Sequence, residues 1–222
     1  MEGVAKLISL LSLVLIITSL AIIEFRNLRR AAYAYCIQAL VMCAIFSTFA
    51  SAGNPHLYWW AGVAFVTKVL IIPYLLIRYI NRTTDVEVEP LFGYIVSIIL
   101  VSVMMIIFYK LTHTYVSFIA PTEVATEEPF RTNLAVSFTI FFMGLYCIMA
   151  RRDAIKTVHG LLILENGIHV SLVSLASGLR ETALVGVVTD VVIAAYMLLY
   201  IIQGIFEKFG STDTFQLKNL KW

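Results

Sequence analysis

Two acidic residues interrupt the most apolar part of the chain. Glu165 lies in the run VHGLLILENGIHVSLVSLA, and Asp190 lies in the next run, ALVGVVTDVVIAAYMLLY. A carboxylate placed in the hydrocarbon of a bilayer costs roughly 2.5–3.5 kcal/mol on insertion scales. A carboxyl group that instead faces a protein interior or a water-filled cavity can gain and lose a proton there. The two acids therefore predict proton or ion transfer within a membrane.

Lys68 and His169 extend this set of charged and titratable residues. Lys68 lies in the middle of another apolar run, and His169 follows Glu165 by four residues, on the same face of a helix. Imidazole titrates near neutrality, so His169 can extend a proton path, but a neutral, hydrogen-bonded core histidine explains it equally well. For the charged residues, the alternative is an ion pair that only locks helices together.

Residues next to Lys68 and Glu165 also indicate a special environment. Pro73 lacks an N–H, which leaves the carbonyl of Val69 without its helical donor and predicts a disturbed helix beside Lys68. Such backbone tends to line protein or water rather than lipid. The Asn166–Gly167 pair offers an amide and a point of close helix approach.

Other polar residues in the apolar runs have structural explanations. Gln38 is the nearest polar counterpart of Glu165 in the first half and is expected to make a packing hydrogen bond. His159 lies near the predicted cytoplasmic interface, where solvent is its expected partner. The cysteines lack metal-ligand spacing and are expected to be buried small hydrophobes; they are Cys36, Cys43 and Cys147.

Composition identifies the class of protein. The 222 residues are 60% hydrophobic and 14% charged, with a mean hydropathy of +0.90. Apolar runs of about 20 residues predict membrane-spanning helices rather than the short alternating segments of a β-barrel. A net charge of +2 is too small to indicate nucleic acid binding, and we expect no iron–sulfur, haem or zinc site in this chain.

The fold is therefore predicted to be all-α, a polytopic membrane protein with seven transmembrane helices. The polar FRNLRR segment after the first run, without a small-residue cleavage site, favours a retained span over a signal peptide. The predicted spans are 4–23, 31–50, 58–79, 91–112, 132–150, 157–177 and 183–206.

The distribution of basic residues predicts the orientation. Eleven of the sixteen Lys and Arg residues fall on one side of the membrane, which the positive-inside rule places in the cytoplasm. The N-terminus is then outside and the C-terminus inside a prokaryotic cell (inner) membrane. Tyr58, Trp59 and Trp60 are expected to anchor the third span at the outer interface.

The two halves of the chain show an internal similarity. At an offset of 122 residues, Val66-Thr67-Lys68-Val69 aligns with Val188-Thr189-Asp190-Val191. Each half also contains a short Arg-rich loop between its first two spans. The simplest explanation is two tandem three-helix units in the same orientation, joined by a linking helix.

The C-terminal segment 131–206 resembles the small NuoK-type (4L) subunit of respiratory complex I. The matching positions are Arg151-Arg152, Gly160-Leu161, Glu165-Asn166 and Asp190, where that family usually has glutamate. The C component of Mrp-type cation/proton antiporters is similar too. The full seven-span layout, with KVLIIPYLL in the third span, resembles the hydrogenase-4 component E family, most weakly over 84–131.

This resemblance implies a division of the chain into four parts. They are an N-terminal three-helix unit (1–83), a linking helix and outer loop (84–131), a NuoK-like unit (132–206) and a cytoplasmic tail (207–222).

The resemblance also implies a role and partners. The chain would be a non-redox, non-catalytic subunit of a complex-I-like group 4 [NiFe] hydrogenase, such as a formate hydrogenlyase relative. Glu165 and Asp190 would be buried acids of a central hydrophilic proton or ion axis, with Lys68 and His169 beside it. The partners would be antiporter-like and NuoH-like membrane subunits and soluble redox subunits, which would carry the [NiFe] centre and iron–sulfur clusters.

Two other functions are compatible with the sequence. The chain could be a component of an Mrp-type cation/proton antiporter without a redox partner, or a structural membrane scaffold whose charges only hold helices together. The first alternative is distinguished by the proteins that copurify with the chain. The second is distinguished by neutralising Glu165 and Asp190, which in a scaffold would lower assembly but not ion pumping.

Overall fold

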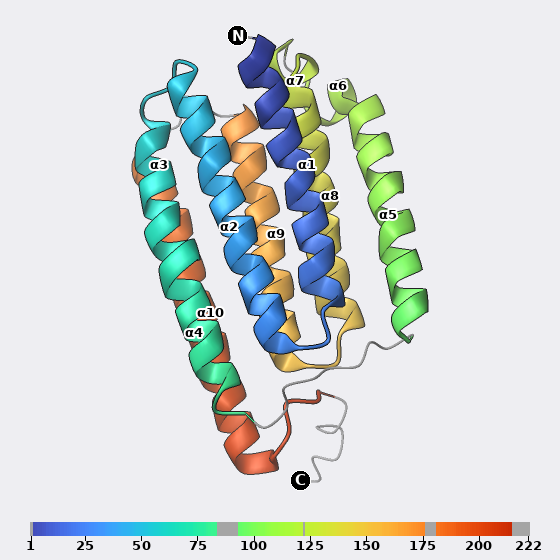
Figure 1. Cartoon of the computed structure of the whole chain (residues 1–222), viewed down its shortest axis with the longest axis vertical. Coiled ribbons are helices and arrows are strands. Elements are labelled where there is room, and N and C mark those ends of the chain that lie inside the picture. The colour runs from blue at the N-terminus through green and yellow to red at the C-terminus, as the bar shows by residue number, and fades with distance from the viewer. Residues whose placement is uncertain (1, 84–92, 122, 176–180, 215–222) are drawn as a thin grey trace.

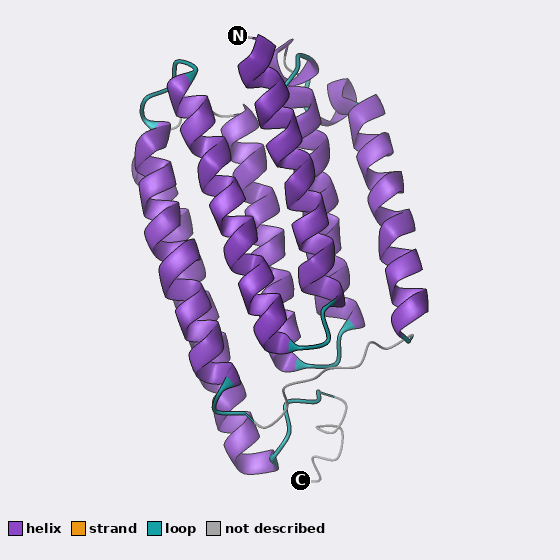
Figure 2. Ribbon diagram, viewed as in Figure 1, coloured by secondary structure: helices purple, strands orange, loops and turns teal. Residues whose placement is uncertain are grey.

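Long helices packed side by side form the protein (Figures 1 and 2). The computed structural model describes residues 2–83, 93–121, 123–175 and 181–214, and seven of its helices are long and apolar enough to cross a membrane. The first four spans are α1 (Glu2–Glu24), α2 (Leu28–Ser51), a composite of α3 (Leu57–Ala64), η1 (Phe65–Ile71) and α4 (Ile72–Ile80), and α5 (Tyr94–Thr114). After the short α6 (Val116–Ile119) and α7 (Glu123–Thr126) follow α8 (Phe130–Ala150), α9 (Ala154–Leu175) and α10 (Glu181–Phe209).

The predicted all-α, seven-span architecture is confirmed. Each predicted span overlaps one of the long helices, and the predicted limits at 91 and 177 lie outside the described residues. Figure 1 shows α5 at one edge of the bundle and the α3–η1–α4 span, with α10 behind it, at the other edge. The division into two repeated units remains a prediction.

Glycine brings the backbones of α8 and α9 into contact at the centre of the bundle. A Cβ atom on Gly144 would lie 2.5 Å from the backbone nitrogen of Leu164, and one on Gly167 would lie 2.8 Å from the carbonyl oxygen of Ser137. The Ser137 hydroxyl also donates a hydrogen bond of 2.7 Å to the Gly167 carbonyl. The close approach expected at Gly167 is therefore present, and it holds the Glu165 segment of α9 firmly against α8.

The start of α9 is held by capping interactions. Asp153 Oδ1 accepts a hydrogen bond of 3.0 Å from the Lys156 backbone N–H, and the Thr212 hydroxyl donates to Asp153 Oδ2. Burial raises the pKa of the Asp153 carboxyl, although these two hydrogen bonds oppose the shift. Lys156 Nζ donates to the last carbonyls of α1, those of Ile22 at 2.6 Å and Ile23 at 3.2 Å. The beginning of α9 and the end of α1 are thereby tied together.

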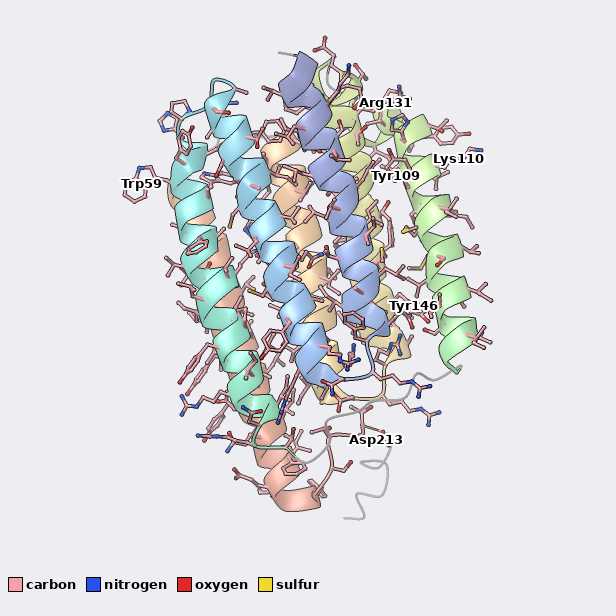
Figure 3. The ribbon with its side chains drawn as sticks, viewed as in Figure 1. Trp59, Tyr109, Lys110, Arg131, Tyr146 and Asp213 are labelled. Atoms are coloured by element: carbon pink, nitrogen blue, oxygen red, sulfur yellow. The ribbon has the colours of Figure 1, made fainter. Side chains whose placement is uncertain are left out.

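The aromatic residues at the start of the third span are divided between outside and inside. Tyr58 and Trp59 are exposed, and Figure 3 shows Trp59 pointing away from the bundle. Trp60 is buried and meets the ring of Phe46 edge-on, with the ring centroids 6.0 Å apart. The exposure of Tyr58 and Trp59 agrees with the expected position at the membrane interface. The expectation is wrong for Trp60, because its ring packs against Phe46 of α2 inside the bundle.

Candidate functional site

A buried ion pair between the third span and α9 forms the centre of the candidate site. Lys68 Nζ lies 2.5 Å from Glu165 Oε2, and the two residues are 0% and 4% exposed. The two side chains come from positions 97 residues apart in the sequence. The sequence predicted both residues as mid-span charges, and the structure brings them together.

Two neighbours on α9 complete the surroundings of the lysine. Lys68 Nζ donates a hydrogen bond of 2.8 Å to Asn166 Oδ1 and lies 3.2 Å from His169 Nδ1. His169 Nδ1 lies 2.7 Å from Glu165 Oε1, as expected for residues four apart on a helix, and 3.1 Å from the Glu165 carbonyl oxygen. The carbonyl and the carboxylate can only accept, whereas the Lys68 ammonium can only donate, so these neighbours of Nδ1 favour opposite tautomers of His169. We call these four residues, Lys68, Glu165, Asn166 and His169, the charged cluster.

The charged cluster continues into a line of polar side chains across the bundle. Asn166 Nδ2 donates to Gln38 Oε1 at 3.1 Å, and Gln38 Nε2 donates to the Ser19 hydroxyl at 2.6 Å. Gln38 and Ser19 are fully buried on α2 and α1. The packing hydrogen bond expected of Gln38 is therefore present, and it connects three helices to the Lys68–Glu165 pair.

Lys68 lies within a π-helical segment, η1. Pro73 follows this segment on the second residue of α4, and the carbonyl of Val69 accepts a contact of 3.7 Å from the Cys36 thiol of α2. The disturbance expected before Pro73 thus takes the form of a wider helical turn. Because a π-helical turn rotates the following residues relative to an α-helix, it contributes to the direction in which Lys68 meets α9.

The charged cluster brings three titratable groups into contact. They are the carboxyl group of Glu165, the amino group of Lys68 and the imidazole of His169. The negative charge of Glu165 and the positive charge of Lys68 neutralise each other. A proton can pass between such groups over hydrogen-bond distances, which is how titratable chains move protons through membranes. The same contacts also suit a structural lock, so function depends on whether these groups exchange protons with both sides.

Asp190 does not join the charged cluster. Its side chain is exposed on α10, and it forms no hydrogen bond or ion pair within the part of the chain that the structure describes. The buried stripe of α10 contains Ala195, Leu199 and Ile202, and at 100° per residue Asp190 lies about 140° around the helix from Ala195. Asp190 is therefore not buried in the isolated chain, because the edge helix α10 turns this face outward, and its place on the proton or ion path stays a prediction.

His159 also differs from its expected environment. It is fully buried on α9 rather than in contact with solvent, and its Nδ1 lies 3.0 Å from the Ile155 carbonyl oxygen. The sequence position near the end of a span indicated solvent, but α9 packs against α8, α2 and α1, and His159 lies inside the bundle.

A second buried ion pair lies near the Arg151 end of the bundle. Arg151 Nη2 donates to Glu24 Oε1 at 2.8 Å and to the Ser97 hydroxyl at 3.1 Å, so α1, α5 and the end of α8 meet here. Ser97 Oγ also lies 3.3 Å from the hydroxyl of Tyr146, which is labelled in Figure 3. Sequence reasoning missed this pair, because both charges are next to loops and were explained by topology. The sequence feature that could have indicated this pair is Glu24, an acidic residue at the end of an apolar run.

Breaking this second pair should destabilise the protein strongly. We expect Arg151→Gln to lower the free energy of unfolding by about 3–5 kcal/mol, because Glu24 would remain buried without its cation. Arg152→Gln is the matched control, since Arg152 is adjacent and exposed. Thermal unfolding of the purified protein in detergent measures both; equal unfolding midpoints for the two variants would contradict a stabilising pair.

Metal binding is not supported by the described residues. Among them, no group of three His, Cys, Asp or Glu side chains is arranged to hold a metal ion. That this chain carries no cofactor of its own remains a prediction.

The chain is similar to one protein family over its C-terminal part and to several curated proteins over most of its length. Residues 132–222 match the family model for NADH-ubiquinone/plastoquinone oxidoreductase chain 4L. Over 211 residues the chain is 28% identical to hydrogenase-4 component E of Escherichia coli (strain K12), covering 93% of this chain and 94% of that protein, and the Shigella flexneri protein of the same name matches equally. An uncharacterized protein of Mycobacterium tuberculosis is 23% identical over 212 residues, 93% of this chain and 92% of its own length. No solved structure matches.

Proposed function

We propose that this chain, a homologue of hydrogenase-4 component E with a chain 4L-like C-terminal part, is a non-redox membrane subunit of a complex-I-like energy-converting hydrogenase. In this role Glu165 gains and loses a proton within the membrane as part of a path that crosses the complex. The observation that carries the proposal is the buried contact of Glu165 with Lys68 and His169. Lys68 and His169 adjust the charge around that carboxyl group.

The charged cluster supports transfer better than a passive lock for two reasons. A structural pair needs two groups, whereas this site adds an imidazole whose Nε2 has no hydrogen-bond partner among the described residues. Glu165 also contacts two titratable groups at once, Lys68 through Oε2 at 2.5 Å and His169 through Oε1 at 2.7 Å. Unsatisfied buried polar atoms cost about 1–3 kcal/mol each, and water that carries protons would satisfy them.

The orientation of the chain, Asp190 and the redox centres each have a place in this role. The end of the bundle with Arg151 faces the cytoplasm, as the basic residues predict. Asp190 supplies a second acid where another membrane subunit covers α10, because an exposed carboxylate at this depth needs a polar partner. The [NiFe] centre and iron–sulfur clusters belong to soluble subunits, which release the energy that drives translocation.

Purification in mild detergent followed by mass spectrometry identifies the proteins that form a complex with this chain. We expect hydrogenase and iron–sulfur subunits, together with antiporter-like membrane subunits, to copurify with it. Recovery of antiporter subunits alone would replace this proposal by the cation/proton antiporter. That alternative rests on the same buried acid and differs only in its partners.

A further inference from the structure

Two buried polar atoms outside the charged cluster belong to residues between Glu165 and the Arg151 end of the bundle. They are the hydroxyl of Tyr35 and Nε2 of His159, and neither has a hydrogen-bond partner among the described residues. Tyr35 and His159 are both fully buried, on α2 and α9. Buried polar atoms are normally satisfied by protein or by ordered water.

The two side chains lie along one interface. The hydrogen bond from Asn166 to Gln38 shows which face of α9 meets which face of α2. His159 precedes Asn166 by seven residues, two helical turns, and Tyr35 precedes Gln38 by three. Both therefore fall on these same faces, and α2 and α9 both begin at the Arg151 end of the bundle (Figure 1).

Helix geometry places the groups in order along the bundle. At 1.5 Å per residue, Tyr35 lies about 4.5 Å below Gln38, and His159 lies about 10.5 Å below Asn166. Tyr35 is thus about 3 Å from the level of Glu165 and about 6 Å from that of His159. The Tyr35 hydroxyl is also close enough to Glu165 to interact with its charge. These intervals are of a length that one or two bridging water molecules would span.

We propose that His159 and Tyr35 carry protons between the Arg151 end of the bundle, predicted to be cytoplasmic, and Glu165. This inference rests on the proposed function and adds the route by which Glu165 exchanges protons with one side.

The contact between His159 and Ile155 indicates which ring nitrogen could take part. Its Nδ1 faces the Ile155 carbonyl at 3.0 Å, so Nδ1 carries the hydrogen and Nε2 is the free base. A proton from cytoplasmic water binds Nε2 and leaves from it to a bridging water. Tyr35 then accepts a proton at its oxygen and passes its own hydroxyl proton to Glu165. One proton reaches the carboxylate, and both residues return to their starting states.

The test uses the assembled complex in inverted membrane vesicles, whose outer surface is the cytoplasmic face. We expect His159→Gln and Tyr35→Phe each to reduce the initial rate of proton uptake by at least about tenfold. The rate at which the complex oxidises hydrogen with a soluble dye as electron acceptor should be unchanged. The double variant should be no slower than the slower single variant, because both residues belong to one route. The controls are His113→Gln, at the other end of the bundle, and Thr139→Val, which removes a buried hydroxyl bonded to its own helix at 2.7 Å.

The outcomes separate this inference from the proposed function. If Glu165→Gln stops uptake while His159→Gln and Tyr35→Phe retain the wild-type rate, the route is refuted and the proposed function stands. If Glu165→Gln has no effect on uptake, the proposed function itself fails. Should His159→Gln prevent assembly, Tyr35→Phe decides alone, because it deletes only one hydroxyl that makes no hydrogen bond with the described residues.

Discussion

Replacing Glu165 by glutamine is expected to reduce proton translocation by the assembled complex about 100-fold, the scale on which a positioned acid–base group contributes. Glutamine keeps the size of the side chain, and its carbonyl oxygen can still accept from Lys68, which contacts Glu165 Oε2 at 2.5 Å in the native protein. It cannot bind and release a proton. Translocation per hydrogen molecule, measured in sealed vesicles, should fall while the amount of complex is maintained.

Two variants on the same helix make this result specific. Glu165→Asp keeps a carboxyl group and should retain part of the translocation, although its shorter side chain weakens the contacts with Lys68 and His169. Ser174→Ala removes a buried hydroxyl that only bonds Val170 of its own helix at 2.8 Å, and it should leave translocation unchanged. A loss of assembly without a loss of translocation in Glu165→Gln would instead indicate a scaffold.

The second large effect is expected from removing the lysine. Lys68→Met leaves Glu165 buried without its cation, and breaking such a pair costs about 3–5 kcal/mol. We expect a corresponding loss of unfolding free energy, together with loss of the Lys68 hydrogen bond to Asn166. Thermal unfolding in detergent measures the change.

A double variant separates charge from packing. Lys68→Met combined with Glu165→Gln removes both charges, so it should recover much of the stability that Lys68→Met alone loses. Translocation should stay absent in the double variant, because the titratable carboxyl is gone. Additive losses of stability in the two single variants would show that the pair contributes no coupling energy.

The spans and the centre of the site followed from local patterns. Apolar runs of about 20 residues predict the helices, because the thickness of a bilayer sets their length. The mid-span positions of Lys68 and Glu165 and the four-residue spacing of His169 singled out these three residues, and the structure shows that they are in contact. Because burying a charge within a membrane is costly, a charged residue in the middle of a span is expected either to take part in ion transfer or to pair with another charge.

Other features depend on how whole helices are rotated and paired. α10 is apolar around most of its circumference, so its sequence does not reveal that Asp190 faces outward. Glu24 and Arg151 lie next to loops, where charges are ordinary, and only the packing of α1 against α8 buries them together. Tyr35 resembles any core aromatic until its hydroxyl is found without a partner among the described residues.

Infrared difference spectroscopy of the working complex can detect directly whether Glu165 gains and loses a proton. If Glu165 gains and loses a proton during turnover, a carboxylic acid C=O band should appear or disappear as hydrogen is supplied. The band should shift in D₂O and be missing in Glu165→Gln. A complex that translocates protons normally while its spectrum shows no carboxyl band dependent on Glu165 would contradict the account.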